Sequence, residues 1–247
     1  MEVKLNADER IDQLYRDNIQ IIQSPSVFSF SLDAVLLANF AEVKQSSRAQ
    51  IVDLCAGNGA VGLFLSKKTN GHVTMVEIQS RLAEMAERSI LLNDLKERYR
   101  VLNLPLADSL GTIKTDSVDS IVCNPPYFPN HPDSKKNPNH FLAIARHEIT
   151  TSLNEILETS QKMNGKLFMV HRPDRLPEII NDFTQNRLAP KRIQFVHSHE
   201  GDEANMVLIE AIKDGRPNGV RILPPIITYD GLEYSPTVKE MLYGSTK

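Results

Sequence analysis

The amino-acid sequence predicts an α/β fold built on one mostly parallel sheet, and two observations support this prediction. Apolar strand-like runs alternate with helix-like runs from about residue 50 onwards. This alternation is typical of parallel strands joined by crossover helices that cover both faces of the sheet. The last two strand-like runs, residues 190–199 and 204–213, have only a polar turn between them and therefore predict a closing antiparallel hairpin.

Seven runs have the apolar composition of buried strands. In chain order they cover residues 49–55, 72–78, 99–104, 117–123, 165–172, 190–199 and 204–213. Four other runs read as helices, with apolar residues near helical spacing. These cover residues 60–68, 80–94, 150–163 and 175–186. The sequence thus predicts a mostly parallel seven-stranded sheet with helices on both faces and one antiparallel strand from the C-terminal hairpin.

We expect residues 1–247 to form a single domain with an extension at each end of its core. The core spans residues 48–213. The N-terminal extension, residues 1–47, begins with a polar helix-like segment and continues into a second helical run, residues 28–41, that suits packing on the sheet. The Pro- and Gly-rich tail, residues 214–247, is expected to wrap the surface of the core.

Composition and charge make several classes of function improbable. A net charge of −3 gives no global basic field of the kind that nucleic-acid binders show, although it leaves room for a local basic patch. No apolar run approaches the ~20 residues of a membrane helix, and the N-terminus lacks the apolar centre of a secretory signal. The two cysteines, Cys55 and Cys123, and the scattered histidines offer no metal-ligand spacing. We therefore expect a cytoplasmic protein with core thiols, no metal and no membrane partner.

The segment between the first predicted strand and the first predicted helix carries the first chemical signal. Its sequence, DLCAGNGAVG, places Gly57, Gly59 and Gly62 where the backbone can turn sharply and approach a ligand closely. The amides of a helix N-terminus lie beside this turn and favour a polar or anionic group. Asp53 and Glu77 end consecutive strands, and an acid in the second position can accept both hydroxyls of a ribose. A Gly-rich turn alone is compatible with any α/β protein, whereas the two acids add a specific signal.

The second signal is Asn124-Pro125-Pro126-Tyr127, which follows the fourth predicted strand. Two prolines cannot donate ladder hydrogen bonds, so the strand must end there, and they hold the neighbouring backbone rigid. The Asn124 side-chain carbonyl and the Pro125 backbone carbonyl can accept both protons of one planar NH2 group and aim its lone pair. Tyr127 can stack on a planar group such as a base. Because ligands of open α/β sheets bind at the carboxyl ends of strands, both signals predict one shared crevice.

Asp53-Leu54-Cys55-Ala56-Gly57-Asn58-Gly59 resembles the cofactor loop of the class I S-adenosylmethionine-dependent methyltransferases, which have a Rossmann-like fold. Glu77-Ile78 resembles their ribose-binding acid and adenine-flanking residue, and Asp108-Ser109 matches their contact with the adenine amino edge. The resemblance implies S-adenosyl-L-methionine as cofactor. The residues that it implies for cofactor binding are Asp53, Cys55, Ala56, Gly57, Asn58, Gly59, Glu77, Ile78, Asp108, Ser109 and Asn124. The chain departs from the family at Cys55, where Gly is usual.

Asn124-Pro125-Pro126-Tyr127 resembles the motif of the amino methyltransferases that modify adenine N6, cytosine N4 or the glutamine amide. Three other segments, residues 28–41, 145–157 and 222–244, resemble one subgroup, the tRNA1(Val) (adenine(37)-N6)-methyltransferases of the methyltransferase small domain type. This resemblance implies that tRNA is the substrate. It also implies the catalytic residues Asn124, Pro125, Pro126 and Tyr127.

The residues expected to contact the substrate lie in and after this motif. We interpret Tyr127, Phe128, Lys135, Lys136 and Arg146 as candidate substrate-binding residues. The polar run 129–145 suits a lid that orders on RNA, and a solvated loop explains it equally well. Arg146 could equally pair with Glu148. The subgroup carries Lys or Thr before the acid equivalent to Asp33, where this chain has Ser31.

Other polar residues near the predicted strand ends have plainer explanations. For Arg172, Arg175, Lys191 and Arg192 we favour a scattered solvated surface over a basic rim around the active site. For His197 and His199, which alternate along a strand, we favour packing or edge positions over catalysis.

Two other functions stay open on the sequence alone. A protein-glutamine methyltransferase of a release factor shares the motif, but that family usually carries a longer N-terminal helical domain than residues 1–47 provide. A catalytically silent module that holds the cofactor or RNA would not require an intact motif at residues 124–127. We expect the protein to be a monomer or a weak homodimer.

Overall fold

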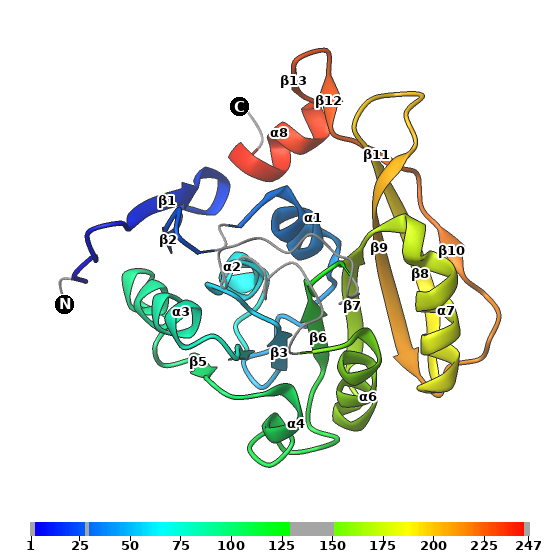
Figure 1. Ribbon diagram of the computed structural model, residues 1–247, viewed down its shortest axis with the longest axis horizontal. Coiled ribbons are helices and arrows are strands. Elements are labelled where there is room, and N and C mark those ends of the chain that lie inside the picture. The colour runs from blue at the N-terminus through cyan, green and yellow to red at the C-terminus, as the bar shows by residue number, and fades with distance from the viewer. Residues whose placement is uncertain (1–2, 28–29, 129–150, 245–247) are drawn as a thin grey trace.

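The computed structural model of the protein describes residues 3–27, 30–128 and 151–244. Within these ranges its main sheet has nine strands, in the order β10-β8-β9-β7-β6-β3-β4-β5, with β11 added beside β8 (Figure 1). These strands are β3 (Gln50–Leu54), β4 (His72–Val76), β5 (Tyr99–Leu102), β6 (Ser120–Cys123), β7 (Lys166–His171), β8 (Leu188–His197), β9 (Ala204–Lys213), β10 (Arg221–Ile222) and β11 (Ile226–Ile227).

The sheet is mostly parallel, as the sequence predicted. β5, β4, β3, β6 and β7 pair in parallel, whereas β9 pairs antiparallel with both β7 and β8. The seven expected strands are all present in this sheet. Two further strands of two residues each, β10 and β11, come from the tail and pair in parallel with β8. The predicted fold class is therefore confirmed, and the tail widens the sheet.

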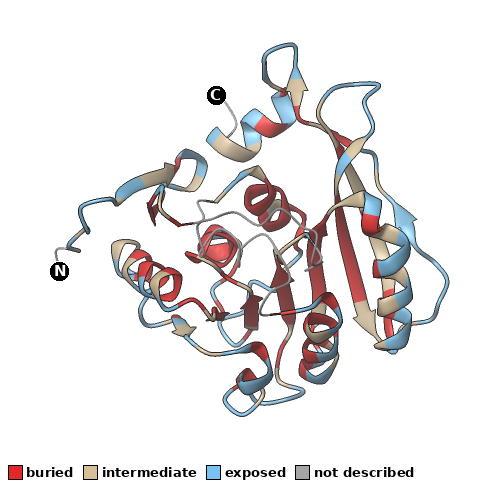
Figure 2. Ribbon diagram, viewed as in Figure 1, coloured by how far each residue is buried: buried red, intermediate tan, exposed pale blue. Residues whose placement is uncertain are grey.

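Helices cover both faces of the sheet (Figures 1 and 2). α1, α2 and α3 lie over one face, and α4, α6 and α7 lie over the other. The helices are α1 (Leu32–Phe40), α2 (Ala60–Phe64), α3 (Ser80–Leu92), α4 (Leu106–Ser109), α6 (Leu153–Met163), α7 (Leu176–Gln185) and α8 (Pro236–Tyr243), with 3₁₀ turns η1 (Tyr15–Asp17), η2 (Leu65–Lys67) and η3 (Pro173–Arg175).

Alternating side chains of the central strands feed two separate cores. Ile51 and Phe168 pack with α1 and α2, whereas Val52 and Leu54 pack with α6 and α7 on the opposite face. All four are almost wholly buried. This is the composition expected for a parallel sheet with both faces covered, in which successive residues are apolar because neither face meets solvent.

The N-terminal extension begins with a β-hairpin, and the helix suggested there by the sequence is wrong. The two smaller sheets of the structure are hairpins, β1 (Arg10–Leu14) with β2 (Ile19–Gln23) and β12 (Tyr229–Asp230) with β13 (Glu233–Tyr234). α3 holds β2 extended: Ser89 Oγ accepts from the Ile22 N–H at 3.0 Å, and Asn93 Oδ1 accepts from the Gln20 N–H at 2.9 Å. These partners are 67 and 73 positions apart in the chain, so local propensity could not reveal them.

The tail contributes to the core as well as to the surface. After β10 and β11 it forms the β12–β13 hairpin and then α8, whose Val238 is fully buried beside α1. Ser235 caps α8 by accepting a hydrogen bond from the Val238 N–H at 3.3 Å. Figure 1 shows α8 near α1 and β1, and α8 contacts η1, so the tail packs against part of the N-terminal extension.

Candidate functional site

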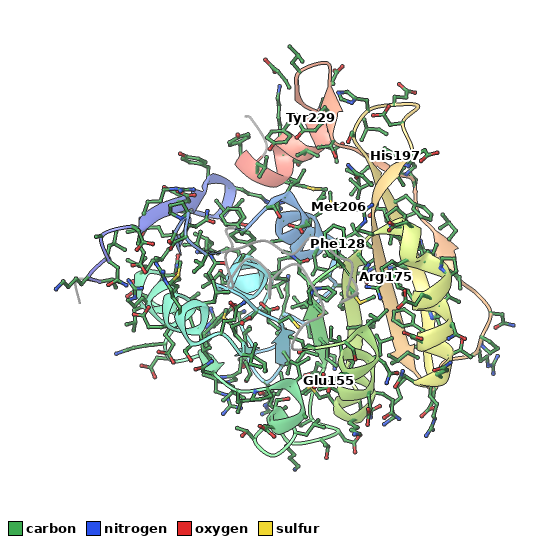
Figure 3. All side chains as sticks on the ribbon, in the orientation of Figure 1. Phe128, Glu155, Arg175, His197, Met206 and Tyr229 are labelled. Atoms are coloured by element: carbon green, nitrogen blue, oxygen red, sulfur yellow. The ribbon has the colours of Figure 1, made fainter. Side chains whose placement is uncertain are left out.

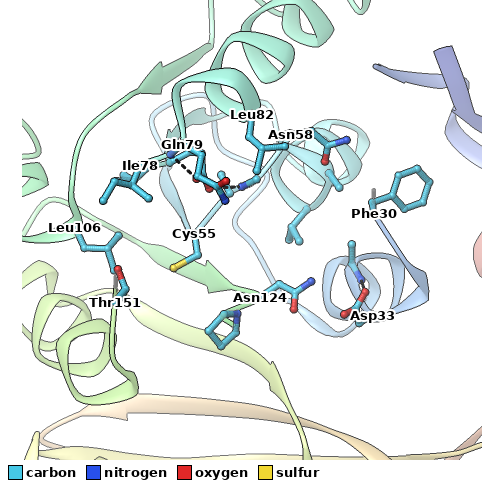
Figure 4. Close-up of a pocket in the computed structure, with 18 of the residues that line it drawn as sticks. Phe30, Asp33, Cys55, Asn58, Ile78, Gln79, Leu82, Leu106, Asn124 and Thr151 are labelled. Atoms are coloured by element: carbon cyan, nitrogen blue, oxygen red, sulfur yellow. Dashed lines mark hydrogen bonds between the residues drawn. The ribbon is translucent and has the colours of Figure 1, made fainter. Parts of the chain in front are cut away.

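A cavity opens at the carboxyl ends of β3, β4 and β6 (Figure 4). It encloses about 1200 Å³ when its open mouth is included. The described residues that line it are Phe30, Ser31, Asp33, Ala34, Cys55, Ala56, Gly57, Asn58, Ala60, Val61, Val76, Glu77, Ile78, Gln79, Leu82, Leu104, Leu106, Asn124, Pro125, Tyr127, Phe128 and Thr151. The Gly-rich loop after β3 and the segment after β6 therefore share one cavity, as expected for an open α/β sheet.

Backbone conformation explains the glycines of the loop after β3. Gly59 is the N-cap of α2 with a φ of 87°, and a Cβ atom there would lie 3.0 Å from Met75 Sδ. Gly57 has a φ of 58° with open space around it, so its requirement for glycine is conformational. Cys55 has a φ of 57°, in the same left-handed region. This conformation accounts for the Gly that related loops usually carry at this position.

Glu77 directly follows β4 and forms part of the cavity wall as a buried carboxyl group. Its Oε2 accepts a hydrogen bond from the Gly57 N–H at 2.8 Å, and its Oε1 accepts one from the Gln79 N–H at 2.8 Å. Burial raises the pKa of Glu77, and the amide donors oppose that rise. Glu77 thus joins the Gly-rich loop to the start of α3 at the edge of the cavity.

Asp53 lies beneath the same loop, outside the cavity wall, and is fully buried in β3. Its Oδ2 accepts a hydrogen bond from the Gly62 N–H at 2.8 Å, which fixes the first turn of α2. Burial raises the pKa of Asp53 to about 7; the Gly62 amide opposes this rise and the nearby Glu77 charge adds to it. The two predicted acids therefore occupy different positions, because only Glu77 reaches the cavity.

The segment after β5 lines the cavity with residues other than the predicted pair. Asp108 is exposed, and Ser109 is buried with its Oγ donating to the Leu106 carbonyl at 2.6 Å. Neither belongs to the described cavity wall, which instead includes Leu104 and Leu106. Pro105 precedes α4 in an extended conformation, and the short helix then turns Leu106 inward and Asp108 outward.

Gln79 lines the cavity, although it belongs to neither of the two sequence motifs. Its side chain is 8% exposed, and within the described residues its Oε1 has no hydrogen-bond partner. A buried carbonyl without a donor is costly, so this oxygen suits an N–H or O–H group of a ligand. The sequence signal is weak: Gln79 stands directly before the predicted helix 80–94, where Ser, Thr, Asp or Asn is preferred. In the structure Gln79 is the N-cap of α3, and its side chain makes no capping bond.

The Asn-Pro-Pro-Tyr segment presents Asn124, Pro125 and Tyr127 to the cavity, whereas Pro126 lies behind it. The Tyr127 hydroxyl lies 2.5 Å from Asp33 Oδ2 and 2.6 Å from Asn124 Oδ1. Burial, followed by the Asp33 carboxylate, raises the pKa of Tyr127 well above its usual range. Asp33 comes from the first turn of α1, so the N-terminal extension contributes directly to the cavity.

Two arginines support this segment from η3 and the end of β7. Arg175 is 9% exposed, donates from Nη1 to the Tyr127 carbonyl at 3.1 Å and pairs with Glu178 at 2.5 Å. The Arg172 guanidinium lies 5.5 Å from the centre of the Phe128 ring. Figure 3 labels Phe128 and Arg175 near the end of β7. The expectation of a solvated surface is therefore wrong for Arg175, which is an internal support of the loop.

The other two basic candidates are engaged within the protein. Lys191 Nζ donates to the Arg216 carbonyl at 2.6 Å. Arg192 pairs with Glu42 at 2.6 Å and with Glu210, and its side chain is only 13% exposed. The solvated surface expected for these residues is thus wrong for Arg192 as well.

His171, at the end of β7, is fully buried and packs on Tyr127 with ring centroids 5.3 Å apart. Its Nδ1 accepts from the Arg172 N–H at 2.8 Å, which places the ring proton on Nε2. Burial, followed by the charge of Arg175, lowers the pKa of His171 to about 4, so the imidazole is neutral at pH 7. His171 therefore forms a neutral support beside Tyr127.

The remaining expectations fall on other parts of the chain. His197, the last residue of β8, pairs with Ile227 of β11 and Ala204 of β9, and its Nδ1 lies 2.7 Å from the Asp202 carbonyl. It is thus a packed strand residue, one of the two positions expected for it. Lys135, Lys136, Arg146 and the run 129–145 lie outside the described residues. Within the described ranges, no helix has the length and apolar character to cross a membrane, and no cluster of His, Cys, Asp or Glu could hold a metal ion.

The fold and the cavity together define a class of protein. An open α/β sheet with a Gly-rich loop after its first parallel strand, a buried acid after the second and Asn-Pro-Pro-Tyr after the fourth is typical of class I methyltransferases, which use S-adenosylmethionine. The cavity wall fits that cofactor: Glu77 can accept from ribose hydroxyls, Ile78 and Leu82 offer apolar surface to a base, and Gln79 offers an acceptor that has no partner among the described residues.

The chain belongs to the methyltransferase small domain family, whose sequence model matches residues 18–185. It is 28% identical over 182 residues to the tRNA1(Val) (adenine(37)-N6)-methyltransferase of Shewanella putrefaciens, covering 72% of this chain and 74% of that protein. A protein of the same name from Parabacteroides distasonis is 27% identical over 184 residues, with 72% and 74% covered. A solved structure described as a predicted O-methyltransferase from Agrobacterium tumefaciens is 25% identical, with a TM-score of 0.64 and 86% and 96% covered. The predicted fold, enzyme class and cofactor are thereby confirmed.

Proposed function

We propose that the protein methylates an exocyclic amino group of tRNA, namely N6 of adenine 37 in tRNA1(Val). The observation that carries this proposal is the placement of Asn124 and Pro125 in the cavity wall that also contains the Gly-rich loop. Two adjacent oxygen acceptors match the two protons of an NH2 group, whereas a hydroxyl nucleophile has only one proton to place. The name shared by the Shewanella and Parabacteroides relatives supports tRNA adenine as the substrate.

Positioning and polarisation provide the catalysis in this proposal. S-Adenosylmethionine, when bound, supplies a methyl group on an electron-poor sulfur, so that a nitrogen–carbon bond forms while the carbon–sulfur bond breaks and its electron pair stays on sulfur. Asn124 and Pro125 accept hydrogen bonds from the two amine N–H groups, draw the nitrogen lone pair out of conjugation and aim it across the cavity. The protein needs no strong base, because the alkylated nitrogen is acidic and releases its proton to water.

We propose distinct roles for the residues on the cofactor side. Glu77 accepts hydrogen bonds from the ribose, Ile78 packs on the adenine, and the backbone of residues 55–58 approaches the ligand closely. Asp53 and Gly59 act by shaping the loop, since Asp53 lies beneath it and Gly59 begins α2. Asp108 and Ser109 would affect the adenine only indirectly, because they help to form the short helix that places Leu106 in the cavity wall.

Tyr127 and Phe128 are the proposed contacts for the target base. An anticodon-loop base is unpaired, so it can enter the cavity without the opening of a duplex. Stacking on an aromatic ring contributes ~1–3 kcal/mol per base. For the tRNA backbone we retain Lys135, Lys136 and Arg146 as proposed contacts, on the sequence alone.

The experiment that tests this function is transfer of a labelled methyl group to purified RNA. We expect label from S-adenosylmethionine to appear as N6-methyladenosine in a tRNA1(Val) transcript, and to be lost when adenine 37 is replaced by guanine. A release factor carrying a Gly-Gly-Gln sequence serves as the alternative acceptor. Label in that protein, or in neither substrate, would contradict the proposal and favour glutamine methylation or a silent binding module.

We further propose that residues 1–247 act as one methyltransferase domain. The extension 1–47 supplies Asp33 to the cavity, the core 48–213 supplies the sheet, and the tail 214–247 supplies α8. A tRNA substrate would place the protein in the cytoplasm. A monomer or weak homodimer stays a prediction, which sedimentation of the purified protein would test.

A further inference from the structure

The Tyr127 hydroxyl stands between two oxygen acceptors. Its Oη is 2.5 Å from Asp33 Oδ2 and 2.6 Å from Asn124 Oδ1. A phenol has one proton to donate, so it can satisfy only one of these oxygens at a time. The direction in which the hydroxyl points decides whether Asn124 Oδ1 already accepts a hydrogen bond or is available to a ligand.

Asp33 is built into a fixed position that favours it as the acceptor. It is 6% exposed, and its Oδ1 accepts hydrogen bonds from the Ser31 hydroxyl and from the Ala34 N–H, the latter at 3.0 Å. At the far end of α1, Lys68 Nζ donates to three backbone carbonyls, among them that of Ala41 at 2.6 Å. The helix that carries Asp33 is therefore held at both ends.

Acceptor strength decides the competition for the proton. A carboxylate accepts a hydrogen bond about twice as strongly as a neutral amide carbonyl does. With Asp33 ionised, the Tyr127 proton points to Asp33 and leaves Asn124 Oδ1 free of a donor. A cavity that accepts an amine at Asn124 requires this oxygen to be free.

We propose that Asp33 is a positioning residue for methyl transfer, which accepts the hydrogen bond of the Tyr127 hydroxyl and so keeps Asn124 Oδ1 available to the substrate amine. This inference rests on the proposed function. Asp33 acts through Tyr127 and Asn124 and need not touch the substrate. Asp33 belongs to the N-terminal extension and Asn124 to the segment after β6. The extension thereby controls an acceptor in a distant part of the chain.

The test combines two single variants with their double variant. In Asp33→Asn an amide replaces the carboxylate at nearly constant shape, so the Tyr127 proton turns towards Asn124, and we expect kcat to fall about tenfold. The KM for S-adenosylmethionine should stay within about twofold. Tyr127→Phe keeps the ring and removes the competing hydroxyl, so the double variant Asp33→Asn/Tyr127→Phe should regain the kcat of Tyr127→Phe alone.

Rescue by the second substitution separates this role from a structural one. If Asp33 only stabilised α1, or touched the substrate directly, the double variant would be as slow as Asp33→Asn or slower, and that result would overturn the inference while the function stood. Asp230→Asn and Tyr243→Phe, both exposed and outside the cavity wall, are the matched controls and should leave kcat unchanged. A wild-type protein that transfers no methyl group to tRNA would contradict the proposed function, and this inference with it.

Discussion

The two halves of the cavity are built in different ways. The half around the Gly-rich loop draws on neighbouring strand ends, after β3 and β4, and on the start of α3. The half around Asn124 combines remote segments: α1 supplies Asp33, the segment after β6 supplies Tyr127, and η3 supplies Arg175. Two side chains that hydrogen-bond to Tyr127, those of Asp33 and Arg175, lie 94 and 48 positions away in the chain.

Because they are built differently, the two halves of the cavity should control different steps. Glu77 reaches the Gly-rich loop by a hydrogen bond to the Gly57 backbone, so the loop side is largely a matter of backbone conformation. In the half around Asn124, side chains determine which oxygen is free to accept a hydrogen bond. Substitutions on the loop side should therefore change cofactor affinity, and substitutions around Asn124 should change the transfer step.

The largest expected effect is that of Asn124→Ala. Removal of one of two fixed acceptors for the amine should lower kcat by about 10²–10³-fold, the usual cost of losing one preorganised hydrogen-bonding group in an active site. The dissociation constant for S-adenosylmethionine, measured by calorimetry, should change little. Asn205→Ala, at an exposed position of β9, is the matched control. An Asn124→Ala enzyme with normal kcat would contradict the claim that the half around Asn124 controls the transfer step.

Glu77→Gln should have the next largest effect, on the other half. An amide nitrogen cannot accept from the Gly57 or Gln79 N–H, so the loop and the proposed ribose contact are disturbed together. We expect cofactor affinity to fall by about 1.5–3 kcal/mol, the range for hydrogen bonds to charged groups. At saturating cofactor kcat should be nearly unchanged, and Glu97→Gln provides an exposed control. A fall in kcat without a change in affinity would show that the halves are not independent.

The same difference explains how far the sequence could predict the site. Glu77 and the glycines near Gly57 were predictable, because each follows a strand whose apolar run is visible and whose end fixes its position. Asp33 and Arg175 were not assigned roles, because their contacts with Tyr127 arise only when distant elements pack. The N-terminal hairpin was missed for the same reason, since Ser89 of α3 keeps β2 extended.

Asp53→Asn should have a smaller effect, seen in the pH dependence of stability. The pKa of Asp53 is about 7 in the folded protein against 3.8 for the free side chain, so the folded state binds the proton more tightly. Stability from this group is complete below pH ~4 and is lost as the pH rises through 7. In urea titrations, the wild-type free energy of unfolding should fall by about 1–2 kcal/mol between pH 6 and pH 8 because of this group, and Asp53→Asn should not show this fall. Equal pH profiles for wild type and variant would contradict the buried, proton-binding role.

The smallest expected effect concerns Cys55. Because its φ of 57° suits glycine, Cys55→Gly should change the free energy of unfolding by less than about 1 kcal/mol and retain cofactor binding. Cys55→Val, with a branched side chain in the same conformation, should destabilise the protein by about 1–3 kcal/mol. Thermal unfolding of both variants checks this. Equal stabilities would mean that the backbone at Cys55 is not constrained to the left-handed region.

The most direct test of a shared cavity is a crystal structure of the protein with S-adenosylhomocysteine. We predict ribose hydroxyls at Glu77, the adenine beside Ile78 and Gln79, and the sulfur directed towards Asn124. Density for the ligand away from the wall formed by Glu77 and Asn124 would show that the cofactor and the amine do not share this cavity.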